Sequence, residues 1–540
     1  MPNIALILGG GASLGAYTGG AVTELLRAFE GNRHGSNVRV GVITGSSSGA
    51  LTAALAARAL IVNPNLLPWI ERAWIDGMDV SILLDPRAAK RSSILDAAAL
   101  EEMSRALITA DPASDDRPSP LLGDSLQLGI TLSNLHGVRY ELSYGFRNSP
   151  ERSFGTRLFD DWIGFGLSRD DGARAPVWEE IRRAAVASAS FPFAFPPRLL
   201  RRDASNFPGA VLPAGSTDID MWYTDGGLFD NEPVGLAKRL ADRSPHSGGD
   251  WRYVLVDPFL RETAEAGGPP PAEPRSAVQV AGLLAGAFLG QGGSKDWIRA
   301  NRTNERLEIL HSLVDRLPEI AESLTDPEAL ELGRLVGELA ERVCDHRVPD
   351  GSDGADPVLE LLEEHIGRIE ARYPEVLARV ETRAARSRLA KLIFLIEAAG
   401  GLDDKEPMPL YLVAPTGGLA GDFLGNFGGL FSREWREADF RAGRRDARRV
   451  IESTLDDVVS YEPDEEAAYQ VPDLDASYDA LPPAQRHALE ELIEARIGRQ
   501  IAAIDAGPLG SLLGFLWRPA VRRWATGRLI DFLRGQGIAS

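Results

Sequence analysis

The pentapeptide at residues 45–49, Gly-Ser-Ser-Ser-Gly, constrains the fold more than any other feature of this chain. It follows an apolar run at residues 38–44 that is typical of a β-strand, and it precedes an Ala- and Leu-rich run at residues 50–60 that is typical of a helix. A serine on so sharp a strand-to-helix turn exposes its hydroxyl group, and flanking glycines let the backbones pass closely. The start of the following helix also favours negative charge beside that serine. The pattern therefore predicts a nucleophilic serine on an α/β fold.

A glycine-rich turn near the amino terminus has the features of an anion-binding site. Residues 4–8 form a short apolar strand, residues 9–15 read Gly-Gly-Gly-Ala-Ser-Leu-Gly, and a helical pattern covers residues 16–29. The free N–H groups of such a turn can bind either a dinucleotide phosphate or an oxyanion. A tight turn with no chemical role is the third interpretation. The dinucleotide fingerprint fits poorly, because Leu14 stands at its third glycine and no acidic residue closes the second strand. An oxyanion hole is the preferred interpretation.

A third segment places a carboxylate at the end of a strand. The short apolar stretch at residues 221–223 leads through Thr224 to Asp225, which is followed by Gly226 and Gly227. Asp-Gly is a common turn dipeptide, so an ordinary turn is one interpretation. The other is a carboxylate beside the serine hydroxyl, where it acts as a general base without a histidine between them.

These three segments, in this order, resemble the patatin-like phospholipases, whose catalytic core is similar to that of cytosolic phospholipase A2. A fourth segment, residues 187–197, resembles the Ala-Ser-x-Ala-x-Pro-x-x-Phe-Pro-Pro stretch of that family, with Ser190 at a position where alanine is usual. Asn231 and Pro233 also fit the pattern after the family's aspartate. The resemblance covers residues 1–260.

The resemblance implies a three-layer α/β/α sheet and a Ser-Asp dyad, with Ser47 as the nucleophile and Asp225 as its base. It implies that the backbone N–H groups of Gly10 and Gly11, together with Ala12, form the oxyanion hole. The glycines that support the motifs are Gly15, Gly45, Gly49, Gly226 and Gly227. The implied reaction is hydrolysis of fatty-acyl esters of lipids, phospholipids included, through an acyl-enzyme, and it requires no metal ion and no cofactor.

Two residues depart from the family pattern. Ala12 stands at the third glycine of the oxyanion loop, and Leu14 stands where Arg or Lys is usual. Alanine still offers a backbone N–H group, so the oxyanion hole survives if the local conformation accepts a Cβ atom. The missing cation affects the expected head-group preference more than the expected reaction.

Two alternative functions remain beside lipid hydrolysis. A carboxylesterase for small soluble esters would use the same chemistry. A non-catalytic binding or scaffold protein would have a site distorted by Ala12 and Leu14. A Ser-His-Asp triad is disfavoured, because it requires a histidine after the acid in a strand-to-loop context. The histidines after Asp225 lack that context: His246, His311, His346, His365 and His487.

Composition excludes several other classes of function. The chain has 58 basic and 78 acidic side chains, a formal charge of −20, which argues against nucleic acid as a partner. Its single cysteine, Cys344, excludes an internal disulfide and a cysteine-built metal site, and it is expected to be a packed thiol on a helix. The acidic residues Asp350, Asp353 and Asp356 lack the spacing of a calcium loop, so we expect a solvated linker there.

The chain divides by composition into four parts: a catalytic core at 1–260, a helical insertion at 261–405, a segment completing the core at 406–455, and an acidic linker with C-terminal helices at 456–540. Helical patterns cover residues 304–314 and 359–371. Residues 126–132 and 138–144 are predicted to be paired strands around a turn at 133–137. Further strands are predicted at residues 251–257 and 409–414, the latter rejoining the core sheet.

The expected location is the cytoplasm, with or without peripheral membrane contact. No basic leader precedes the first strand, and the longest apolar stretch, residues 280–289, is too short to cross a bilayer. Residues 512–533 combine Trp, Leu and Arg, which suits either a helix in a lipid interface or one docked on the body. The Phe- and Gly-rich residues 421–431 suit either ring packing or an acyl-chain tunnel. Lipid or ester is the expected substrate, and the sequence does not predict the oligomeric state.

Overall fold

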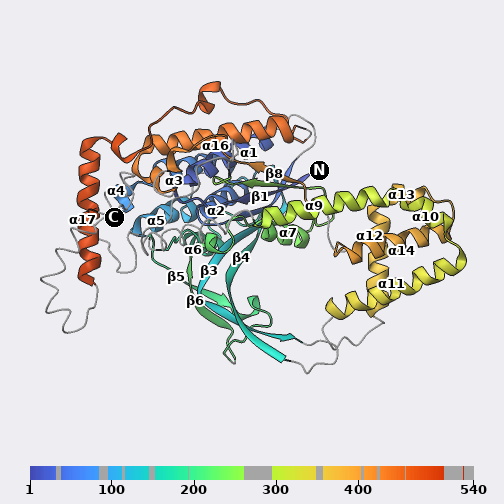
Figure 1. Ribbon diagram of the computed structural model, residues 1–540. Coiled ribbons are helices and arrows are strands. Elements are labelled where there is room, and N and C mark those ends of the chain that lie inside the picture. The colour runs from blue at the N-terminus through green and yellow to red at the C-terminus, as the bar shows by residue number, and fades with distance from the viewer. Residues whose placement is uncertain are drawn as a thin grey trace. The chain divides into compact units, whose positions relative to one another are not determined.

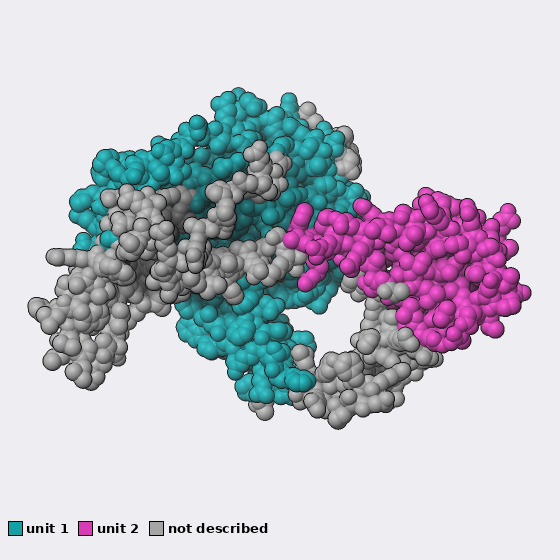
Figure 2. Space-filling model, viewed as in Figure 1, with its two compact units in different colours: residues 1–296, 409–540 teal, residues 297–408 magenta. Residues whose placement is uncertain are grey.

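The structure is a computed structural model of the chain (Figure 1). It describes residues 1–31, 38–83, 95, 97–111, 116–144, 152–192, 194–213, 215–260, 295–347, 357–402, 407–422, 426–456, 458–503 and 527. The chain forms two compact units, which Figure 2 distinguishes by colour: residues 1–296 with 409–540, and residues 297–408.

The first unit is built on a mixed sheet. Its strands are β1 (Asn3–Leu8), β2 (Arg39–Gly45), β3 (Leu122–Tyr144), β4 (Arg152–Ser168), β5 (Arg198–Asp203), β6 (Asp218–Thr224), β7 (Trp251–Val256) and β8 (Leu410–Val413). Their order is β5-β6-β3-β2-β1-β7-β8, and β4 pairs with β3. Strand β1 lies between β2 and β7 and runs parallel to both, as does β8 to β7. A strand buried on both faces reads as a continuous apolar run, which explains why β1 was recognisable from sequence.

Helices flank this sheet and give the three-layer α/β/α fold that was predicted (Figure 1). The helices of the first unit are α1 (Gly15–Glu30), α2 (Ser48–Ile61), α3 (Pro68–Ile75), α4 (Val80–Leu83), α5 (Ala97–Ser104), α6 (Val177–Ser188), α7 (Val234–Arg243), α16 (Arg433–Thr454) and α17 (Pro483–Ala503). Helices α1 and α16 pack closely at two glycines. A Cβ atom on Gly20 would overlap the carbonyl oxygen of Phe440, and one on Gly443 would overlap that of Tyr17.

The second unit is helical and has its own apolar core. Its helices are α9 (Lys295–Val314), which begins in the first unit, α10 (Leu317–Ser323), α11 (Asp326–Arg347), α12 (Pro357–Arg372), α13 (Pro374–Ala378) and α14 (Arg383–Ala399). Leu307, Val336, Ile369, Leu389 and Phe394 lie in that core. The helical patterns predicted at residues 304–314 and 359–371 are confirmed.

The predicted reversal at residues 133–137 is wrong. Strand β3 continues through this stretch and pairs on both sides of it with β4, a strand that is not predicted from the sequence. The side-chain oxygen of Asn134 accepts hydrogen bonds from the N–H groups of His136 (2.9 Å) and Gly137 (3.0 Å), and Gly137 has a φ of +67°. These residues form a local irregularity, with a register shift between Ser133 and Val138. Polar turn residues here kink a strand instead of ending it.

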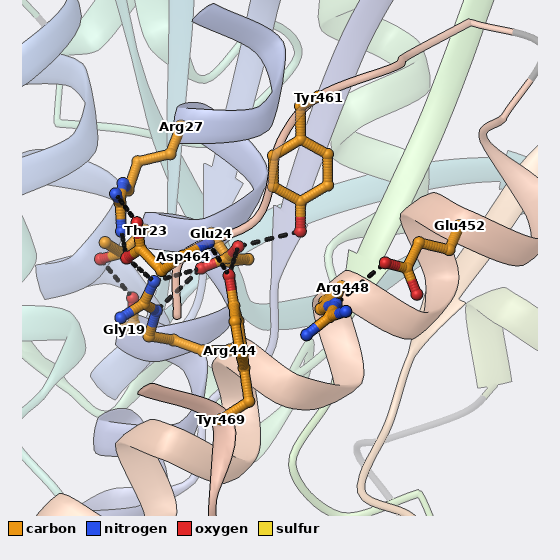
Figure 3. Close-up of polar contacts among 10 residues, drawn as sticks. All are labelled: Gly19, Thr23, Glu24, Arg27, Arg444, Arg448, Glu452, Tyr461, Asp464 and Tyr469. Carbon is orange, nitrogen blue, oxygen red and sulfur yellow. Dashed lines mark hydrogen bonds and ion pairs between the residues drawn. The ribbon is translucent and has the colours of Figure 1, made fainter. Parts of the chain in front are cut away.

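The segment that follows α16 is fastened to α1 by a buried polar cluster (Figure 3). Glu24 of α1 is 1% exposed. Its carboxylate accepts hydrogen bonds from the hydroxyl groups of Tyr461 (2.9 Å) and Tyr469 (2.7 Å) and pairs with Arg444 of α16. Arg444 also pairs with Asp464, which is bound to Arg27. The cluster therefore joins α1, α16 and residues 461–469.

Several sequence predictions fall outside the described residues: those for residues 280–289 and 350–356, and the one for residues 512–533, of which only residue 527 is described. Cys344 lies on α11, but its side chain is outside the described part. No helix in the described part is long and apolar enough to span a membrane.

Candidate active site

Ser47 lies on a strained turn between β2 and α2. Its φ and ψ are 51° and −123°, in a region that non-glycine residues seldom adopt. The two flanking glycines are required by close packing of the backbone. A Cβ atom on Gly49 would overlap the carbonyl oxygen of Leu8, and one on Gly45 would lie 2.5 Å from the carbonyl oxygen of Gly49. This is the geometry of a nucleophile elbow.

Asp225 follows the end of β6 and lies beside Ser47. The hydroxyl group of Ser47 donates a hydrogen bond of 2.6 Å to Oδ2 of Asp225, and the N–H group of Gly227 donates one of 2.8 Å to Oδ1. Burial disfavours the charged form and raises the pKa of Asp225 to about 7, although both hydrogen bonds act in the opposite direction. The contact between serine and carboxylate is direct, with no histidine between them.

Two serines of the segment at residues 187–197 hold the backbone of this pair. The hydroxyl oxygen of Ser188 accepts a hydrogen bond of 2.9 Å from the N–H group of Ser47. The carbonyl oxygen of Ser190 accepts hydrogen bonds from the N–H group of Asp225 (3.0 Å) and the hydroxyl group of Thr224 (2.7 Å). In the sequence this segment is recognisable only as a family feature, because these contacts join residues far apart in the chain.

The hydroxyl group that distinguishes Ser190 from the usual alanine has a local partner. It donates a hydrogen bond of 2.7 Å to the carbonyl oxygen of Val186, near the end of α6. Because the helix itself satisfies this buried hydroxyl group, the exchange of alanine for serine leaves the contacts of the Ser190 carbonyl group unaffected.

The glycine-rich loop lies against Ser47. A Cβ atom on Gly10 would be 2.6 Å from Cβ of Ser47 and 2.5 Å from Oδ1 of Asn231. The Asn231 amide group donates a hydrogen bond of 3.4 Å to the carbonyl oxygen of Gly10, which orients this peptide. Gly11 precedes a short helical turn, Ala12–Leu14, in which the N–H group of Leu14 bonds to the carbonyl oxygen of Gly11.

The two departures from the family pattern have different physical consequences. Ala12 has a φ of 49°, so its Cβ atom imposes strain that glycine would not have. Leu14 is fully buried in the core, where a cation without a partner would be costly. The leucine therefore suits the surroundings in this chain.

The remaining motif glycines also have no room for a side chain. A Cβ atom on Gly15 would overlap the ring of Trp74, and one on Gly226 would overlap the carbonyl oxygen of Thr131. On Gly227 it would lie 2.5 Å from Oδ1 of Asn231. The glycines permit the close approach of segments that position Ser47 and Asp225.

An apolar cavity of about 40 Å³ lies beside Ser47. Its lining consists of Ala12, Ser13, Ser47, Ser48, Leu51, Trp74, Met78, Leu100, Ala189, Phe191, Phe195, Phe427 and Leu430. The rings of Phe191 and Phe427 pack edge to face with their centroids 5.2 Å apart. Phe427 and Leu430 belong to the Phe- and Gly-rich stretch, so the described part of that stretch contributes walls to this cavity. Within the described ranges, no cluster of three or more His, Cys, Asp or Glu side chains could hold a metal ion.

Comparison with known proteins identifies the fold family. The model of the patatin-like phospholipase family matches residues 6–238, a span that includes the glycine-rich loop, Ser47 and Asp225. These residues form a patatin-like phospholipase domain. The family is one of lipid acyl hydrolases, so lipids are the substrate class of the domain's relatives in general.

Two curated relatives match the chain, and both are uncharacterized proteins. One is the "Uncharacterized membrane protein Rv3479" of Mycobacterium tuberculosis, 30% identical over 269 residues, which are 47% of this chain and 24% of that protein. The other is the "Uncharacterized protein y4iI" of Sinorhizobium fredii, 24% identical over 345 residues, 47% of this chain and 49% of that protein. The chain thus spans about a quarter of the length of the first relative and about half of the second.

Proposed function

We propose that the protein is a serine acyl hydrolase that cleaves fatty-acyl ester bonds of lipids, phospholipids included. Ser47 is the nucleophile and Asp225 is its general base. The observation that carries the proposal is the 2.6 Å hydrogen bond from the Ser47 hydroxyl group to the buried carboxylate of Asp225. The apolar cavity beside Ser47 supports it, because an acyl chain needs apolar walls next to the nucleophile.

In the first half of the reaction, Asp225 takes the hydroxyl proton as Oγ of Ser47 attacks the ester carbonyl carbon. The tetrahedral intermediate carries negative charge on the former carbonyl oxygen. Backbone N–H groups of Gly10, Gly11 and Ala12, together with the start of α2, stabilise this charge. The carbon–oxygen bond to the leaving alcohol then breaks, and the alcohol receives the proton from Asp225. The product is an acyl ester on Ser47.

In the second half, water replaces the alcohol. Asp225 accepts a proton from the water molecule, whose oxygen attacks the acyl carbonyl carbon, and the same N–H groups stabilise the second oxyanion. Collapse of this intermediate releases the fatty acid and returns the proton to Oγ of Ser47. A carboxylate with a pKa of about 7 is a stronger base than an ordinary aspartate, which explains how a dyad can work without histidine.

The test compares the wild type with Ser47→Ala, Asp225→Asn and Ser46→Ala on soluble acyl esters and on phospholipid vesicles. Ser46→Ala is the matched control, because this buried serine belongs to the same pentapeptide and its hydroxyl group has no hydrogen-bond partner in the described part of the chain. We expect Ser47→Ala and Asp225→Asn to lose about a thousandfold or more in activity, and Ser46→Ala to retain it. Equal hydrolysis by the wild type and Ser47→Ala would overturn the proposal.

The small size of the cavity favours a second candidate, a carboxylesterase that acts on small soluble esters. Hydrolysis of soluble short-chain esters without hydrolysis in vesicles would select this candidate. The non-catalytic alternative is tested by labelling with a fluorophosphonate, which needs an activated serine. Labelling of the wild type but not of Ser47→Ala would exclude it.

A further inference from the structure

The indole ring of Trp74 is fixed between three helices beside the candidate site. Trp74 belongs to α3 and is 2% exposed. Its ring lies against α1 at Gly15 and Gly19, since a Cβ atom on Gly15 would overlap the ring and one on Gly19 would be 2.8 Å from it. Its N–H group donates a hydrogen bond of 3.0 Å to the hydroxyl oxygen of Thr52 in α2. The ring therefore has one defined position.

That position separates two apolar spaces. The first is the cavity beside Ser47, and the second is a smaller void of about 10 Å³, whose walls include Leu55, Met103 and Ile108. Leu51, Trp74 and Met78 line both spaces. An acyl chain that extended from Ser47 toward the second void would meet these three side chains before it reached that void.

We propose that Trp74 is a specificity-determining residue, which closes the inner end of the acyl-binding cavity and so limits the length of the acyl chain. This inference rests on the proposed function, because it assumes that the acyl group of the substrate is bound to Ser47. The apolar walls identify an aliphatic chain as the occupant, and the satisfied indole N–H group presents no unpaired donor to that chain.

Trp74 is a better barrier than the other two shared residues. Met78 is unbranched and polarizable, and side chains of this kind adapt readily to a ligand. Leu51 is smaller than tryptophan. The indole, by contrast, is held by the glycine surface of α1 and by Thr52. Shortening Trp74 would join the two spaces and extend the cavity toward Met103 and Ile108.

The test measures kcat/KM for a series of p-nitrophenyl esters from butyrate to hexadecanoate, in the wild type, Trp74→Ala and Trp74→Phe. Trp178→Ala is the control, since Trp178 is also buried but lines neither space and packs against Arg58. A methylene group in an apolar pocket is worth about tenfold or more in discrimination. We expect the ratio of long-chain to short-chain kcat/KM to rise at least about tenfold in Trp74→Ala and less in Trp74→Phe. The ratio should be unchanged in Trp178→Ala.

The outcomes separate this inference from the proposed function. If hydrolysis requires Ser47 but Trp74→Ala lowers kcat/KM equally for every chain length, Trp74 does not limit the chain and only the inference fails. If the wild type hydrolyses none of the esters or vesicles, the proposed function fails as well. Should Trp74→Ala not fold, Trp74→Leu removes most of the ring and gives the same comparison, with cooperative thermal unfolding as the check on its fold.

Discussion

Asp225 accepts a 2.6 Å hydrogen bond from the hydroxyl group of Ser47, although 178 residues separate them in the chain. The carboxylate is only 3% exposed, and this burial is the largest influence on its ionisation. Two properties follow from this burial: the pH dependence of the proposed reaction, and a cost to stability when the carboxylate is charged.

The proposed reaction is expected to gain activity as the pH rises through about 7. Burial raises the pKa of Asp225 to about 7, and only the deprotonated carboxylate accepts the serine proton. The measurement is kcat/KM for a soluble ester between about pH 5 and pH 9, with the unfolding temperature recorded at each pH. An acidic limb centred near pH 4 would contradict the role given to the buried carboxylate.

Asp225→Asn is expected to stabilise the fold at alkaline pH. The pKa of Asp225 is higher in the folded state than in the unfolded state. The contribution of this group to the free energy of unfolding is therefore fully present below about pH 4 and is lost as the pH rises through about 7. Asparagine does not ionise, so the advantage of the variant should grow by about 2 kcal/mol or more between about pH 5 and pH 8. Urea unfolding at both pH values measures it. A constant difference between variant and wild type would show that Asp225 has an ordinary pKa.

Gly49→Ala is expected to destabilise the fold by about 2 kcal/mol or more, because the new Cβ atom would overlap the backbone of β1 at Leu8. Activity should fall with it, since Leu8 leads directly into the glycine-rich loop that is proposed to stabilise the oxyanion. Gly248→Ala is the control, with no atom within 4 Å of the added Cβ. Denaturant unfolding compares the two variants, and equal, small effects would mean that the backbones are not in close contact at Gly49.

Ala12→Gly should change stability little, while Ala12→Val should destabilise by about 2 kcal/mol or more. Glycine relieves a left-handed conformation that costs alanine about 1 kcal/mol. It also raises the conformational entropy of the unfolded chain, which destabilises the fold by a similar free energy. A β-branched residue cannot adopt this φ without greater strain. Thermal unfolding together with ester hydrolysis checks both. Unimpaired stability in Ala12→Val would contradict the positive φ.

Glu24→Gln is expected to destabilise the protein by about 3 kcal/mol, because it leaves the charge of Arg444 partly unpaired in a buried cluster (Figure 3). Glu452→Gln is the matched control: Glu452 pairs with Arg448 near the surface of α16, where such a pair contributes about 1 kcal/mol or less. Chemical denaturation of both variants gives the comparison. If the two losses are alike, the cluster does not fasten residues 461–469 to α1.

Local patterns in the sequence were sufficient for the elements that carry the candidate site. The apolar run of β1 and the switch from strand to helix at β2 and α2 depend on neighbouring residues alone, so these elements were predicted correctly. The return of the strand at residues 409–414 to the core sheet was also predicted, and β8 pairs with β7. The same local reasoning failed at residues 133–137, where turn-forming residues lie within β3.

The sequence by itself determined which residue types stand at the ends of which strands, and from this came Ser47, Asp225 and the glycine-rich loop. Only the tertiary structure decided which of these groups meet. The contacts of Ser188 with Ser47 and of Ser190 with Asp225, the raised pKa of Asp225, and the position of Trp74 beside the cavity all depend on packing between distant segments. Hydrogen bonds and burial of this kind arise when the layers close around the sheet, so no local pattern in the chain records them.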